Sequence, residues 1–263
     1  MPALWLIALA GLVVGLLYGS LGVGGAVVGT PLLALMGVPA LMAVGSPLPA
    51  TLPAALVAAA AYRRRREIDI SAIVPAAVAA VPGAIAGALL SGVVGGRTLL
   101  VLSGFLLAVA GIELLRPAAV LLAAGASRSF GTTGPALTPP TARRRAVRIA
   151  LCALAASFLS GLLANGGAAL LVPLFILAVG MDYRTAAGTS LLIVPLIALP
   201  AVVIHAALGH IDWAVAVAFG AGAVPAAALG AALSGHFSPR MLQRCLGWLL
   251  VAFAVAFVVR ILL

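Results

Sequence analysis

Two glycine pairs occupy matching places in the chain, and each separates a long apolar run from a shorter one. The pairs are Gly24-Gly25 and Gly166-Gly167. Glycine lets a helix break and lets the backbone approach a ligand closely. The helix that restarts after each pair exposes free backbone N–H groups and the positive end of its dipole. Such ends bind anions without a buried Lys or Arg, so the pattern predicts an anion site made from two helix ends.

Polar side chains near the two breaks could complete this site. Hydroxyl and amide groups donate hydrogen bonds while staying neutral, and they cost less inside a membrane than charged groups do. The candidate substrate-binding residues, with the glycine pairs included, are Ser20, Gly24, Gly25, Ser46, Asn165, Gly166, Gly167, Thr189 and Ser190. The alternative is that the glycines only allow helices to pack closely, as small residues do in membrane bundles.

Two ionisable residues are candidates for proton coupling, because ionisable groups within membrane helices are costly enough to suggest function. Glu113 lies in an apolar run, although it could instead pair with Arg116 one helical turn away. His205 lies near the end of another apolar run and is a candidate because histidine can change its charge near neutral pH. The alternative is that it is simply an interfacial residue. For Asp69 and Asp212, each just before an apolar run, helix capping is the expected role.

The chain carries no pattern typical of a catalytic or metal site. The His-Glu-x-x-His motif of zinc proteases is absent, and the two cysteines lie in apolar runs without metal-ligand spacing. An intramembrane hydrolase would need a serine nucleophile in a Gly-flanked turn with a histidine base. Ser190 and His205 are present, but Ser190 lacks that turn. We therefore expect no enzyme activity, no metal and no cofactor.

The elements that carry these residues must be membrane helices. The 263 residues are 65% hydrophobic and 8% charged, with a mean hydropathy of +1.30, whereas soluble domains have roughly 25% charged residues. The expected partner of the surface is therefore the lipid bilayer. Apolar runs near the ~20 residues that a spanning helix needs recur along the chain. They are Leu4–Leu21, Ser46–Tyr62, Ile70–Val94, Leu99–Leu115, Ala186–Leu208, Trp213–Leu233 and Cys245–Leu263.

The net charge of +10 is best explained by membrane topology. All 15 basic residues are Arg, and most of them lie in two clusters. Short basic clusters beside spanning helices mark the cytoplasmic side of a membrane protein. No basic surface interleaved with aromatic residues is present, so we expect no nucleic-acid partner. The clusters are Arg63–Arg66 and the set Arg116, Arg128, Arg143, Arg144, Arg145 and Arg148.

The chain contains an internal repeat at an offset of about 143 residues. Within 81–92, eight of twelve residues are identical to those of 224–235. The intervening stretch is rich in Gly, Ser, Thr and Pro and reads as a linker. The sequence therefore predicts a first transmembrane repeat at 1–116, a cytoplasmic linker at 117–147 and a second transmembrane repeat at 148–263.

The orientation of the two repeats depends on how the interrupted segments cross the membrane. If each counts as one crossing, the repeats are parallel, and the better assignment places 11 Arg inside and four outside. If each is re-entrant or crosses twice, the repeats are inverted, with 13 Arg inside, two outside and both termini outside. The second count fits the positive-inside rule better. The expected fold is all-α and integral to the membrane. Each of its two inverted repeats has a Gly-interrupted first segment, broken or re-entrant, and three spanning helices.

The order of these motifs resembles the sulfite exporter TauE/SafE family of membrane permeases, over essentially the whole chain. The first half carries Gly15-x3-Gly19-x2-Gly22-x-Gly24-Gly25-x5-Pro31-Leu32 and then Ala43-Val44-Gly45-Ser46. The second half carries Gly161-x4-Gly166-Gly167-x5-Pro173-Leu174, Ala187-Gly188-Thr189-Ser190 and His205-x3-Gly209-His210-Ile211-Asp212. The resemblance implies a plasma-membrane permease for small, often sulfur-containing anions such as sulfite or organosulfonates.

The expected function is therefore the transport of a small, sulfur-containing anion across the bacterial plasma membrane by alternating access. Two broken segments at matching places in two halves are typical of a transporter's binding site. A passive anion channel is the main alternative, because channels also use broken helices and backbone dipoles; an intramembrane hydrolase is a weaker one. The expected partners are a small anionic solute and the bilayer, and a homo-oligomer is compatible with the sequence.

Overall fold

A computed structural model describes residues 3–22, 25–91, 105, 108–109, 111–116, 139–163 and 168–262, and all regular secondary structure in these residues is helical. The helices are α1 Leu4–Leu21, α2 Gly25–Leu35, α3 Ala40–Gly45, α4 Leu48–Arg64, α5 Ile70–Ser91, α8 Pro139–Leu163, α9 Ala168–Leu174 with the π-helical turn Phe175–Val179, α10 Tyr183–Ala207, α11 Trp213–Ser234 and α12 Pro239–Leu262. Six described spans, in α1, α3–α4, α5, α8, α10 and α11, are long and apolar enough to cross a membrane. The prediction of an all-α membrane protein is confirmed.

Helix α8 begins at Pro139, inside the segment that the sequence assigns to the linker. Pro139 and Pro140 contribute to the linker prediction, but proline is also favoured in the first turn of a helix, where no N–H is needed. Arg143, Arg144 and Arg148 then lie on the first turns of α8. The apolar part of α8 therefore continues a helix that starts in a polar, basic segment.

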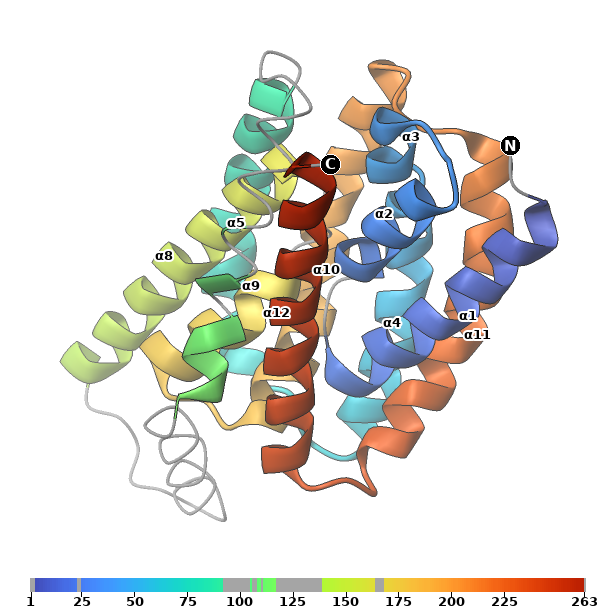
Figure 1. Cartoon of the computed structure of the whole chain (residues 1–263). Helices are drawn as coiled ribbons and strands as arrows, with labels where there is room; N and C mark the ends of the chain where they lie inside the picture. Colours follow the sequence, from blue (N-terminus) through green and yellow to red (C-terminus); the bar gives the residue numbers. More distant parts are fainter. Residues whose placement is uncertain are drawn as a thin grey trace.

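Among the described helices, the most extensive contacts are those of α1 with α11 and of α5 with α8. A Cβ placed on Gly15 of α1 would lie 2.2 Å from the Ala223 carbonyl oxygen of α11. A Cβ placed on Gly87 of α5 would lie 2.0 Å from the Phe158 carbonyl oxygen of α8. Glycine is required here because the helix backbones touch. In Figure 1 the two pairs lie on opposite sides of the bundle, with α4 and α10 between them.

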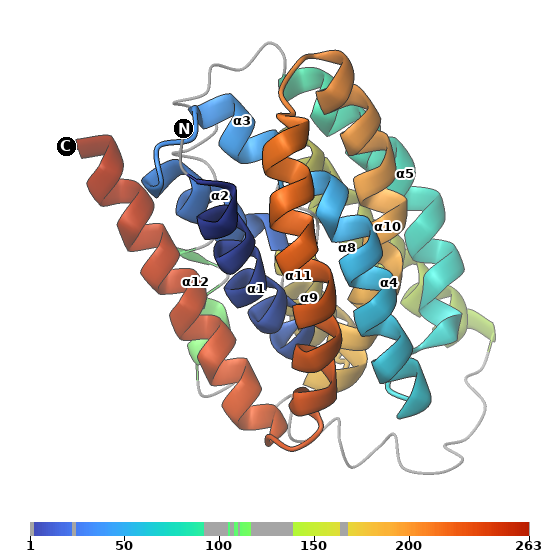
Figure 2. The same cartoon turned by 90° about the vertical axis from the view of Figure 1, so that its right-hand side faces the viewer.

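The bundle has two ends with different chemistry. At the arginine end, the turn between α4 and α5 meets the start of α10 and the end of α11, through Arg65 and Arg184. At the histidine end, His205 in the last turn of α10 lies beside His210, which precedes α11. The chain ends marked N and C both lie towards the histidine end, at the top of Figures 1 and 2.

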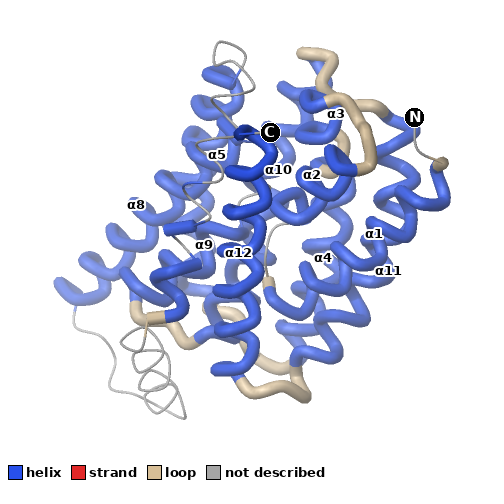
Figure 3. The backbone as a smooth tube through the Cα atoms, in the orientation of Figure 1, coloured by secondary structure: helices blue, strands red, loops and turns tan. Residues whose placement is uncertain are grey.

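The helices α1 and α8, which occupy equivalent places in the repeat, run in opposite directions. Gly11 faces Phe219 and Gly19 faces Ala227, so α1 runs parallel to α11 and starts at the histidine end. Helix α8 runs parallel to α5 and starts at the arginine end, where Arg145 forms an ion pair with Asp69. Helix α2 then folds back beside α1 (Figure 3).

Candidate functional site

Helix α1 ends inside the protein rather than at its surface. Gly22 follows Leu21, the last residue of α1. The φ of Gly22 is +69°, a left-handed conformation that glycine adopts without strain. The last carbonyl groups of a helix need partners. Tyr183 donates to the Leu21 carbonyl at 2.7 Å, and Tyr62 donates to the Ser20 carbonyl at 3.2 Å. These buried tyrosines therefore satisfy carbonyl groups at the end of α1.

The first turn of α2 lies near the middle of the bundle. A Cβ placed on Gly25 would lie 3.7–3.8 Å from the side chains of Thr51, Tyr18 and Val14, which is ordinary contact distance. The residue after Val14, Gly15, faces Ala223, halfway along α11. The free N–H groups and the positive dipole end of α2 are thus placed at mid-depth.

Two buried hydroxyl groups, one on α1 and one on α10, have no hydrogen-bond partner among the described residues. They are Tyr18 Oη and Ser190 Oγ, in side chains that are 2% and 0% exposed. Ser190 lies one turn after Ala187, whose Cβ would be 2.7 Å from a Cβ placed on Gly22. A buried hydroxyl without a partner costs roughly 1–3 kcal/mol, a cost that a hydrogen bond to a ligand would offset. We call Tyr18, Gly25, Thr51 and Ser190 the α1–α2 site.

The other hydroxyls predicted for the site are used in structural contacts at opposite ends of the bundle. Ser46 Oγ accepts a hydrogen bond from the Asp212 N–H at 3.0 Å, at the histidine end. Thr189 Oγ1 accepts one from the Asp69 N–H at 2.9 Å, at the arginine end. These two contacts join equivalent positions of the repeat. Both hydroxyls keep their own proton for a further hydrogen bond.

The remaining predicted binding residues divide into two groups. Ser20 donates to the Leu17 carbonyl of its own helix at 3.3 Å. Gly24, Asn165, Gly166 and Gly167 lie outside the described residues. The α1–α2 site therefore contains Gly25 and Ser190 of the predicted set, and adds Tyr18 and Thr51. Thr51 Oγ1 donates to the Leu48 carbonyl at 2.7 Å.

The two candidates for proton coupling have different surroundings. Glu113 forms an ion pair with Arg116 at 2.8 Å, with side chains 33% and 61% exposed, which is the arrangement of the alternative interpretation. His205 is buried in the protein, and its Nδ1 lies 3.1 Å from Nδ1 of His210. His205 Nε2 lies 3.5 Å from the Gly161 carbonyl oxygen. Since Tyr62 is the repeat equivalent of His205, both residues contact the last turn of an interrupted helix.

The capping role expected for Asp212 is confirmed, and Asp69 has a second partner. Asp212 accepts hydrogen bonds from the Ala214 and Val215 N–H groups at the start of α11. Asp69 accepts hydrogen bonds from Ser71 and pairs with Arg145. Burial alone raises the pKa of the Asp69 carboxyl. The hydrogen bonds from Ser71 and Arg145 outweigh burial and hold this pKa below its ordinary value.

An ionic cluster at the arginine end joins the two halves of the chain. Glu67 lies 2.8 Å from Arg65 Nε and 3.3 Å from Arg184 Nη1. Arg65 also donates to the Ala231 carbonyl at 2.8 Å, and Arg184 donates to the Phe237 carbonyl at 2.7 Å. Sequence patterns indicate only a topological role for Arg65. The adjacent acidic residue was the available signal of a cluster.

Replacing Glu67 by Gln is expected to destabilise the protein, because it leaves two partly buried guanidinium groups without a counter-charge. We expect a loss of about 1–2 kcal/mol, or a melting temperature about 5 °C lower. The matched control is Glu113→Gln, whose exposed ion pair contributes about 0–1 kcal/mol. Thermal unfolding in detergent measures both. Equal melting temperatures for the two variants would contradict the role given to Glu67.

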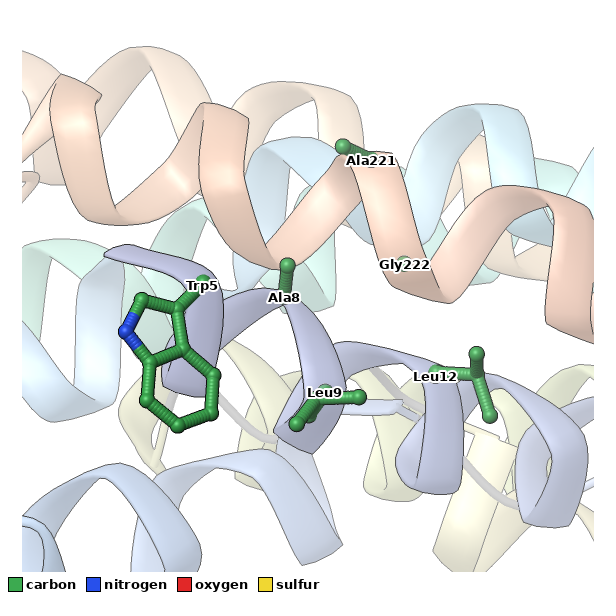
Figure 4. A pocket seen from close by; sticks show the side chains of 6 residues that line it. All are labelled: Trp5, Ala8, Leu9, Leu12, Ala221 and Gly222. Atoms are coloured by element: carbon green, nitrogen blue, oxygen red, sulfur yellow. The ribbon is translucent and has the colours of Figure 1, made fainter. Parts of the chain in front are cut away.

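An apolar surface hollow between α1 and α11 is distinct from the α1–α2 site. It is lined by Trp5, Ala8, Leu9, Leu12, Ala221 and Gly222 (Figure 4). Trp5 is 64% exposed and no lining residue can ionise. The hollow has the composition of a lipid-facing surface.

Long apolar helices around buried polar side chains define a multi-pass membrane protein. The chain belongs to the family described as Sulfite exporter TauE/SafE, which it matches over residues 7–257. The resemblance seen in the sequence is thereby confirmed.

Relatives in two bacteria are named as transporters. The chain is 29% identical over 250 residues to a "Probable membrane transporter protein" of Xylella fastidiosa (strain 9a5c), covering 94% of this chain and 91% of the relative. It is 27% identical over 246 residues to "Probable membrane transporter protein YjnA" of Bacillus subtilis (strain 168), covering 90% and 92%. No solved structure matches the chain significantly. The chain is thus a multi-pass membrane protein of a transporter family.

Proposed function

We propose that this protein is a permease that moves a small sulfur-containing anion, such as sulfite or a sulfonate, across the bacterial plasma membrane. The observation that carries the proposal is a pair of buried hydroxyls, Tyr18 Oη and Ser190 Oγ, without a partner among the described residues. The Tyr18 ring lies beside Gly25 at the start of α2. A helix start supplies N–H donors and a positive dipole end, and hydroxyls add neutral donors. The family description supports sulfite in particular.

The proposed mechanism is alternating access in an inverted repeat. Its support is that α1 and α8 run in opposite directions and that equivalent residues make equivalent contacts across the two halves. The cluster of Arg65, Glu67 and Arg184 would close the cytoplasmic end, and the contact of His205 with His210 the outer end. Two closures of different chemistry suit a carrier, in which each must open in turn.

Flux measurements in proteoliposomes test the proposal. Sulfite uptake should saturate with concentration and should be accelerated by sulfite on the other side of the membrane. A passive anion channel would conduct faster and would show no such exchange. Taurine, sulfoacetate, thiosulfate, sulfate and acetate form the comparison panel. If none of them competes with sulfite and sulfite itself is not transported, the proposed substrate class is wrong.

Gly25→Ala links transport to the α1–α2 site. The added methyl group would stand at 3.7–3.8 Å from its neighbours, so the fold has room for it. The methyl group would nevertheless occupy space in the first turn of α2, where an anion would approach the backbone. We expect sulfite flux to fall at least about tenfold, or about 1.4 kcal/mol, with unchanged thermal stability.

A further inference from the structure

Three arginines at the start of α8 form an exposed cationic surface. Arg143, Arg144 and Arg148 are exposed, and together with Val147 they line a surface hollow. Arg144 and Arg148 lie one helical turn apart, as do Arg143 and Val147, so the four residues occupy one side of the helix. The neighbouring Arg145 points elsewhere and pairs with Asp69 of α5. That pair holds the start of α8 in place.

The counter-charge for this surface must come from outside the chain. The chain has 15 basic and five acidic residues. Three of the carboxylates form ion pairs with other arginines, and two accept backbone hydrogen bonds at helix starts. No carboxylate is left for Arg143, Arg144 and Arg148. The five are Glu67, Asp69, Glu113, Asp182 and Asp212.

The same face of α8 continues as an apolar stripe. Val147, Leu151 and Leu154 are 51%, 60% and 41% exposed, and they succeed one another at spacings of four and three residues. Three or four residues along a helix return to the same face. The cationic groups of α8 are therefore followed, in the direction of the membrane interior, by a surface that suits hydrocarbon.

We infer that this face of α8 binds an anionic phospholipid, with its phosphate groups between Arg143, Arg144 and Arg148 and its acyl chains along Val147, Leu151 and Leu154. Guanidinium groups bind phosphate oxygens through paired hydrogen bonds. Basic pockets at the membrane surface of spanning helices bind such head groups. The apolar stripe distinguishes a lipid from a soluble phosphate, which would gain nothing from it. The inference depends on the membrane position of the chain and not on the transported substrate.

Thermal unfolding with added lipid tests this inference. Purified protein in neutral detergent is mixed with cardiolipin, phosphatidylcholine or inorganic phosphate. A bound ligand stabilises the folded state, so cardiolipin at saturation should raise the melting temperature of the wild-type protein by about 5 °C. The triple variant R143Q/R144Q/R148Q should lose most of this shift. The matched control R63Q/R64Q/R66Q, which removes three arginines from the end of α4 and the turn that follows it, should keep it.

Native mass spectrometry of the same samples provides a second readout: wild-type protein should retain cardiolipin, and the α8 variant should not. Single variants R143Q and R148Q give the same test with smaller losses should the triple variant fail to fold. The inference is overturned if phosphatidylcholine or inorganic phosphate stabilises the protein as much as cardiolipin does. It is equally overturned if the α8 variant keeps the shift or the control variant loses it.

Discussion

Gly222→Ala should prevent the normal packing of the bundle, whereas Gly220→Ala, two residues away on the same helix, should be tolerated. A Cβ on Gly222 would lie 2.0 Å from the Ala8 carbonyl oxygen, so the backbones of α11 and α1 would have to separate. Overpacking typically costs 1–3 kcal/mol, and a backbone obstacle that cannot rotate away puts the cost at about 3 kcal/mol or more. We expect a melting temperature lower by about 10 °C, or no monodisperse protein.

The control variant has the opposite expectation. The nearest atom to a Cβ on Gly220 is the Ala50 Cβ at 3.4 Å, an ordinary contact. Alanine is also favoured over glycine in a helix by about 1 kcal/mol. Size-exclusion profiles and thermal unfolding of both variants make the comparison. Similar stability for Gly222→Ala and the wild-type protein would mean that α1 and α11 do not pack as described.

Tyr18→Phe and Ser190→Ala should each lower sulfite transport by about tenfold without lowering stability. Each substitution removes a hydroxyl that has no partner among the described residues. Removing an unpartnered buried hydroxyl relieves its desolvation cost, so the melting temperature should stay the same or rise. A lost hydrogen bond to a charged ligand costs roughly 1.5–3 kcal/mol, which corresponds to a tenfold or larger loss of affinity.

Tyr62→Phe is the matched control for Tyr18→Phe. Its hydroxyl donates to the carbonyl groups at the end of α1. Removing it should therefore lower stability by about 1 kcal/mol. If Tyr18→Phe and Ser190→Ala transport sulfite with wild-type parameters, the α1–α2 site does not bind the transported anion.

The sequence predicts the helix ends better than it predicts which residues meet. The apolar run 4–21 coincides with α1, because the glycines after Leu21 stop a helix locally. The cap at Asp212 is likewise a local pattern. By contrast, Tyr183 contacts the Leu21 carbonyl from 162 positions along the chain, and no local pattern encodes that contact.

The candidate site could be predicted only in part for the same reason. Composition and spacing select hydroxyls near the breaks, but packing decides which of them are free. Ser46 and Thr189 face backbone N–H groups of the opposite half, whereas Ser190 faces none among the described residues. Tyr18 lies in an apolar run, where sequence patterns treat tyrosine as one more hydrophobic residue.

The exchange of helix partners between halves has a consequence for synthesis. Helix α1 packs on α11, and α5 packs on α8, so neither repeat contains its own packing partner. Because ribosomes add roughly 5–20 residues per second, α11 is synthesised on the order of ten seconds or more after α1. The glycine faces of α1 are exposed to lipid or to the insertion machinery during that interval. A gene cut between the repeats would therefore yield two fragments that need each other to become stable.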